Sequence, residues 1–201
     1  MLQIDVKKTI LLVVVICLHN AFASAKNSVW LEKLDSILAV SENIVAEKNN
    51  KIAMLKQMAA KETNTSLLLE RYWELSEEYY VFKFDSAKIY VEKGLALARK
   101  TNNRRYVVAN SIMLAKLLAI GGLYSEAISN LSKINPESLE PDLLFDYHIA
   151  YFTIYSYWAD YCNDNTYSPI YKEKSNACLK KAVDIIDKNS EAYDYYMGEY
   201  Y

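Results

Sequence analysis

The sequence predicts an all-α protein of stacked antiparallel helical hairpins, preceded by a long N-terminal helix. Two observations predict this fold class. Glycine and proline are scarce, with four and three among 201 residues, so little material exists for tight β-turns. Apolar residues also recur at helical spacing along most of the chain, and short polar segments separate these stretches.

Residues 1–25 have the pattern of a secretory signal peptide. Lys7 and Lys8 precede an apolar stretch at residues 10–18, and the small residues at 21–25 suit a signal peptidase. The apolar stretch is shorter than the about 20 residues that a membrane-spanning helix needs, and no later stretch is longer. We therefore expect an exported, periplasmic chain, with an uncleaved N-terminal anchor as the alternative.

Residues 26–62 form an amphipathic helical segment with a seven-residue repeat. The repeat is carried by Leu31, Leu38, Val45, Ile52 and Ala59. The segment is one long helix, or two helices broken near Ser41. Packing along the first hairpin is favoured over a coiled coil, because the polar residues Ser41 and Lys48 interrupt the second seam position.

Residues 63–201 are predicted to form the helical hairpins. Thr65 or Ser66, Asp85, Ser168 and Ser190 are plausible helix caps. The expected helices cover residues 67–82, 85–100, 105–120, 125–134, 142–162, 169–186 and 191–201. The last helix ends without a polar closing segment, so we expect the repeats to continue beyond the end of this chain.

The segment from Ala115 to Leu131 has the spacing of a tetratricopeptide (TPR) repeat. Ala115 and Ala127 are small enough for two helices to cross closely, and Gly122 permits the turn between them. Ala87 precedes Ala127 by 40 residues, against about 34 in the standard repeat. The hairpins are therefore expected to form a divergent TPR-like solenoid, a class of fold that binds partners on its surfaces.

The residues that enzymes use are scarce. His148 is the single histidine after residue 25, and neither a nucleophile motif nor metal-ligand spacing accompanies it. We therefore predict no catalytic residue, no metal and no cofactor. Cys162 and Cys178 are expected to be free thiols, since their predicted positions in a hairpin are too far apart to bridge. A net charge of −2 without a basic block argues against direct nucleic-acid contact.

Tyrosine is the unusual residue of this chain, with 18 copies. A stripe at helical spacing consists of Tyr147, Tyr151, Tyr155 and Trp158. One interpretation is an aromatic wall in a helical groove, which would stack on sugar rings or hold a peptide. The other is that these rings fill seams between helices. The stripe is thus the candidate surface for a protein or oligosaccharide ligand.

Four features resemble the N-terminal part of the SusR-like regulators of polysaccharide utilisation. They are residues 33–37, the long helix through Lys56, residues 79–87 and residues 161–177. The resemblance implies a periplasmic sensor region whose ligand controls transcription, tethered to the inner membrane by a segment beyond residue 201 and followed by a cytoplasmic DNA-binding part. The alternative is a free-standing periplasmic TPR scaffold for protein–protein interaction.

Overall fold

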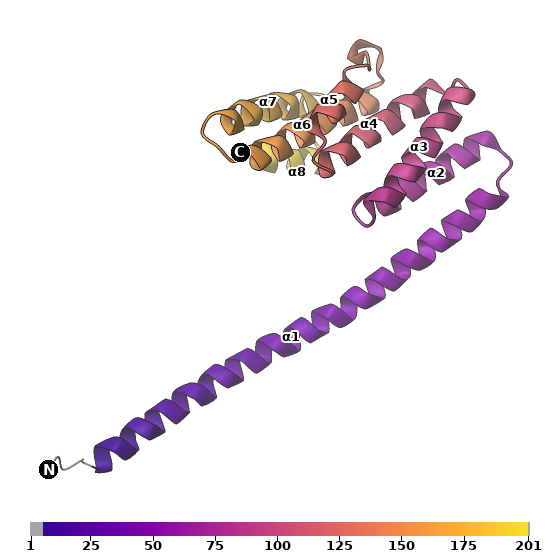
Figure 1. Ribbon diagram of the computed structural model, residues 1–201. Coiled ribbons are helices and arrows are strands. Elements are labelled where there is room, and N and C mark those ends of the chain that lie inside the picture. Colours follow the sequence, from indigo (N-terminus) through magenta and orange to yellow (C-terminus); the bar gives the residue numbers. More distant parts are fainter. Residues whose placement is uncertain (1–5, 201) are drawn as a thin grey trace. The chain divides into compact units, whose positions relative to one another are not determined.

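The structure is a computed structural model that describes the backbone of residues 6–200 and the side-chain exposure of residues 29–199. The all-α prediction is confirmed over these residues (Figure 1). The helices are α1 (Val6–Lys61), α2 (Thr65–Tyr80), α3 (Phe84–Lys100), α4 (Arg104–Ile120), α5 (Tyr124–Leu131), the 3₁₀ helix η1 (Pro136–Ser138), α6 (Pro141–Cys162), α7 (Tyr167–Val183) and α8 (Glu191–Tyr200).

The chain divides after Lys51 into two compact units, each described by itself. The first five residues of the predicted signal peptide, and the side chains of all of it, lie outside the described residues. Within the part of the chain that the structure describes, no helix has the length and apolar character needed to cross a membrane.

The first unit holds one continuous stretch of α1, with no break at Ser41. The repeat residues Leu31, Leu38 and Val45 are exposed there, at 58%, 51% and 42% of their surface. Further along α1, in the second unit, Ile52 and Leu55 are buried. They join an apolar core with Leu75 of α2, Val91 of α3 and Leu117 of α4.

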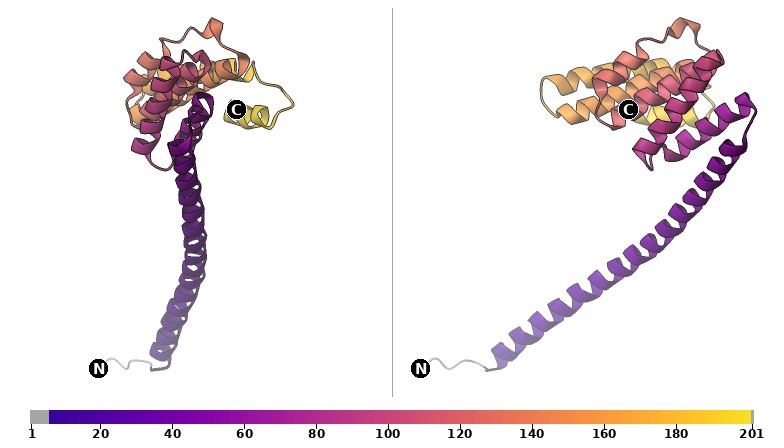
Figure 2. Two further views of the ribbon diagram at one scale, coloured as in Figure 1. Left: turned by 90° about the vertical axis from the view of Figure 1, so that its right-hand side faces the viewer. Right: turned by 45° about the vertical axis from the view of Figure 1, so that its right-hand side comes forward.

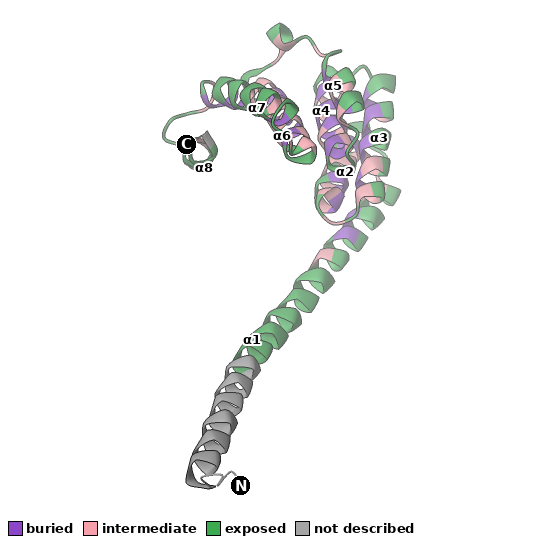
Figure 3. Ribbon diagram, turned by 60° about the vertical axis from the view of Figure 1, so that its left-hand side comes forward, coloured by how far each residue is buried: buried purple, intermediate pink, exposed green. Residues whose placement is uncertain are grey.

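The second unit is a series of antiparallel hairpins in which successive helices pack against one another (Figure 2). Its buried residues gather where the helices meet (Figure 3). Ala115 of α4 and Ala127 of α5 are both fully buried in a core shared with Ile154 of α6. A further core joins Leu179 of α7 to Ile149 of α6, with α8 packed against it.

The turns after α3 and α4 have the same geometry. Asn102 and Gly122 follow the two helices with φ of 54° and 77°. The next residue donates its N–H back to the last turn: Asn103 to the Ala98 carbonyl at 2.9 Å, and Leu123 to the Leu118 carbonyl at 2.8 Å. This is a Schellman motif, which satisfies the free carbonyls at a helix end.

Several helix caps differ from the sequence prediction. Asn64, not Thr65 or Ser66, caps α2, and its side chain accepts from the N–H groups of Ser66 and Leu67. α3 begins one residue before Asp85, which therefore lies in the first turn. Ser168 is buried inside α7, and the Asp164 carboxylate accepts the first N–H groups instead. α7 also ends at Val183 rather than 186, whereas Ser190 does accept from the Tyr193 N–H.

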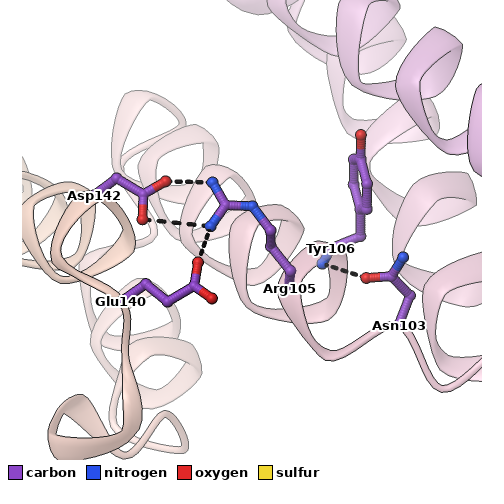
Figure 4. A network of polar contacts seen from close by, with 5 residues as sticks. All are labelled: Asn103, Arg105, Tyr106, Glu140 and Asp142. Atoms are coloured by element: carbon purple, nitrogen blue, oxygen red, sulfur yellow. Dashed lines mark hydrogen bonds and ion pairs between the residues drawn. The ribbon is translucent and has the colours of Figure 1, made fainter.

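A cluster of charges links the N-terminal ends of α4 and α6. The Arg105 guanidinium donates to the carboxylates of Asp142 and Glu140 (Figure 4). This contact lowers the pKa of Asp142, chiefly through the hydrogen bond from Arg105. All three side chains are mostly exposed, so the cluster contributes little to the stability of the fold.

Candidate functional site

Residues of the second unit surround a hollow of about 420 Å³, which we call the α6–α8 hollow. Its lining combines aromatic rings with charged and hydroxyl groups, on α2, α4, α6 and α8. The lining residues are Tyr80, Lys116, Ile149, Phe152, Thr153, Ser156, Tyr157, Asp160, Tyr195, Tyr196 and Glu199. Size and composition both suit a small polar ligand with apolar faces.

One face of α6 lines the hollow. Ile149, Phe152, Ser156 and Asp160 recur every three or four residues and so lie along one side of the helix. Ser156 is held in place, because its hydroxyl lies 2.6 Å from that of Ser175 on α7. Sequence reasoning missed this face. The sequence signal for this face of α6 is helical spacing, as in the tyrosine stripe, but here the spacing is carried by a mixture of aromatic and polar residues.

Lys116 of α4 places a positive charge in the hollow. Its ammonium nitrogen lies 5.2 Å from the centre of the Tyr80 ring, a cation–π geometry. Burial lowers the pKa of Lys116, while the charges of Asp146 and Glu77 oppose this shift. Among the ion pairs of the described residues, none involves Lys116. Because Lys116 lines the hollow, its ammonium group can donate hydrogen bonds to a ligand there.

Tyrosine hydroxyls and carboxylates supply the remaining polar groups. Burial, together with the neighbouring Tyr157, raises the pKa of Tyr80 to about 12. Burial also raises the pKa of Tyr196. Both hydroxyls thus keep their protons at neutral pH and can donate, while the exposed side chains of Asp160 and Glu199 can accept.

The predicted stripe on α6 lies on a different face and forms a continuous aromatic ladder. The ring centres of Tyr147 and Tyr151 are 5.1 Å apart, and those of Tyr151 and Tyr155 are 5.9 Å apart. Tyr171 of α7 stacks on Trp158 at 4.3 Å and on Tyr155 at 6.2 Å. Tyr147 is buried, and the other four rings of the ladder are half-buried. The role of this ladder as a ligand surface stays a prediction.

A second hollow of about 430 Å³ lies near η1 and has a different character. Arg99, Arg104 and Lys133 line it together with aliphatic and small polar residues, and no aromatic ring contributes. It therefore lacks the stacking surface that the α6–α8 hollow offers.

The residues with catalytic or metal-binding potential are dispersed. His148 is half-buried, packs edge-to-face on Tyr147, and has its pKa lowered, mainly by burial. Cys162 and Cys178 are free and half-buried. Within the described part of the chain, no group of three histidine, cysteine or carboxylate side chains is placed to hold a metal ion.

Successive antiparallel hairpins with small residues at their crossings define a TPR-type helical repeat. A family model described as the SusR N-terminal TPR domain matches residues 38–201. The chain therefore belongs to this family, the TPR domains of SusR-type regulators of polysaccharide utilisation, which are non-catalytic modules. No curated protein and no solved structure shows significant similarity to the chain.

Proposed function

We propose that this chain is the periplasmic sensor part of a membrane-bound SusR-type regulator, and that it binds an oligosaccharide in the α6–α8 hollow. The observation that carries the proposal is the mixed lining of that hollow, in a module whose family regulates polysaccharide utilisation. Export of the chain and tethering to the inner membrane belong to the proposal as well. Free-standing scaffolding of proteins is the alternative function.

The chemistry of a sugar ring explains why this lining is suitable. A pyranose ring has apolar C–H faces, which stack on aromatic rings, and a rim of hydroxyl groups, which need donors and acceptors. Tyr157 and Tyr195 are exposed aromatic rings in the hollow, at 43% and 63% of their surface. Lys116 can donate and Asp160 can accept beside them.

Ligand binding at this place would also act on the packing of α8. Tyr196 of α8 contacts Phe145 of α6 edge-to-face at 5.4 Å and lines the hollow as well. A ligand that touches both helices would favour the packed position of α8, because it binds that arrangement better than an open one. This shift in packing is the signal that we propose the regulator transmits.

Calorimetric titration with short linear glucan, fructan and xylan oligosaccharides tests the proposal. We expect one of these to bind, and Tyr157→Ala to weaken its binding about 10-fold through loss of one stacking ring. Lys133→Ala, in the second hollow, is the matched control and should bind as the unchanged chain does.

Two outcomes would contradict the proposal. If Trp158→Phe weakens binding while Tyr157→Ala does not, the aromatic ladder is the ligand surface instead of the α6–α8 hollow. If none of the oligosaccharides binds and a protein partner is captured through this domain, the scaffold alternative replaces the sensor.

A further inference from the structure

The first unit carries an apolar stripe with no cover among its own described residues. We call it the N-terminal stripe; it consists of Trp30, Leu31, Leu34, Ile37, Leu38, Ile44 and Val45. Each of these residues exposes between 42% and 63% of its surface. Isolated apolar residues on a surface are ordinary, but a contiguous stripe of this length marks an interaction site.

We propose that the N-terminal stripe pairs with the same stripe of a second copy of this chain, as a parallel two-stranded coiled coil. The repeat of Leu31, Leu38 and Val45 has a period of 3.5 residues per turn. A seven-residue repeat keeps one helix face in contact with a partner helix when the two helices wind around each other. Leu34 occupies the second seam position of the same repeat.

The N-terminal stripe of one copy is complementary to the identical stripe of a second copy. In a parallel, in-register pair, Leu31, Leu38 and Val45 each meet their own equivalent, so every layer at this seam position is apolar. At the second seam position Leu34 meets Leu34, whereas Ser41 and Lys48 form polar layers, which specify the register at a cost in stability. Polar residues such as Glu32, Ser36, Asn43 and Asn50 lie on the opposite side of the helix, facing away from the partner.

The area of the stripe is sufficient for a stable pair. Burying one large apolar side chain removes on the order of 100 Å² from water. The seven residues of the stripe therefore approach the roughly 800 Å² per partner of a standard stable interface. The pairing involves the first unit only and does not depend on the ligand of the second unit.

Sedimentation equilibrium of the whole chain tests the pairing. We expect a mass twice that of one chain, and a single-chain mass for the Leu38→Glu/Val45→Glu variant. Val40→Glu is the matched control: Val40 is also exposed, at 57%, but lies on the opposite side of the helix from Leu38 and Val45. This variant should keep the double mass, and circular dichroism should show equal helix content in all three.

A single-chain mass for the unchanged protein at tens of micromolar would overturn the proposal, since the stripe would then be covered in some other way. So would a double mass for the Leu38→Glu/Val45→Glu variant. Orientation is tested separately by Leu31→Cys, which should form a covalent dimer on oxidation when the unchanged chain does not. Failure of this cross-link in a chain of double mass would overturn the parallel arrangement.

Discussion

Gly94 of α3 and Asn110 of α4 meet at a helix crossing that has no room for a larger side chain. A Cβ atom at position 94 would lie 2.6 Å from Oδ1 of Asn110. Asn110 is fully buried, and its amide nitrogen donates to the Tyr106 carbonyl at 2.8 Å. The asparagine is therefore held where it would collide with the new methyl group.

Gly94→Ala is expected to lower the free energy of unfolding by about 1–3 kcal/mol, the usual cost of an overpacked core. Urea unfolding followed by circular dichroism measures this change. In the Gly94→Ala/Asn110→Ala variant the collision is removed, so the combined loss should be smaller than the sum of the two single losses. If the losses of unfolding free energy are additive, the contact between position 94 and Asn110 is not what restricts the size of the side chain at this helix crossing.

The aromatic residues show how far sequence can predict a site. Spacing placed Tyr147, Tyr151 and Tyr155 on one stripe, and the structure does bring these rings together. Tyr157 and Phe152 belong to another face, which becomes a hollow only because Lys116 and Tyr195 are contributed by distant helices. Contacts of this kind between distant helices depend on tertiary packing, and no local sequence pattern encodes them.

At the scale of helices, the sequence predicts where each helix lies better than where it begins. Helical periodicity and small residues at crossings located the hairpins, because these features follow from local geometry. The starts of α2 and α7 differ because the capping side chains, Asn64 and Asp164, precede the serines and threonines that the pattern favoured. Several residue types can cap a helix, so composition alone does not select among neighbours.

Gly122 follows α4 in a left-handed conformation that residues other than glycine, asparagine and aspartate adopt only with strain. Its φ is 77°, and a Cβ atom there would meet nothing within 4 Å. Gly122→Ala should therefore destabilise the fold by about 1 kcal/mol through backbone strain alone. Gly198→Ala is the control, because Gly198 is helical and equally free of neighbours, so alanine should be neutral or stabilising.

Thermal unfolding of the two variants measures this difference. A lower melting temperature for Gly122→Ala than for Gly198→Ala supports the Schellman turn as a required element of the hairpin. Equal melting temperatures would contradict it.

At the scale of the whole molecule, α6 organises the second unit through three of its faces. One face joins the central core with α4 and α5, and a second stacks its aromatic ladder on α7. The third lines the α6–α8 hollow. A ligand in this hollow would thus act directly on the helix that packs against α4, α5 and α7.

The measurement that tests this account most directly is hydrogen exchange of the chain with and without its best-binding oligosaccharide. We predict slower exchange in α8 and in the hollow-lining turns of α6, because the ligand would hold these two helices together. Exchange near Lys133 in the second hollow should not change. Protection confined to α7, which carries Tyr171 of the aromatic ladder, would contradict binding in the α6–α8 hollow.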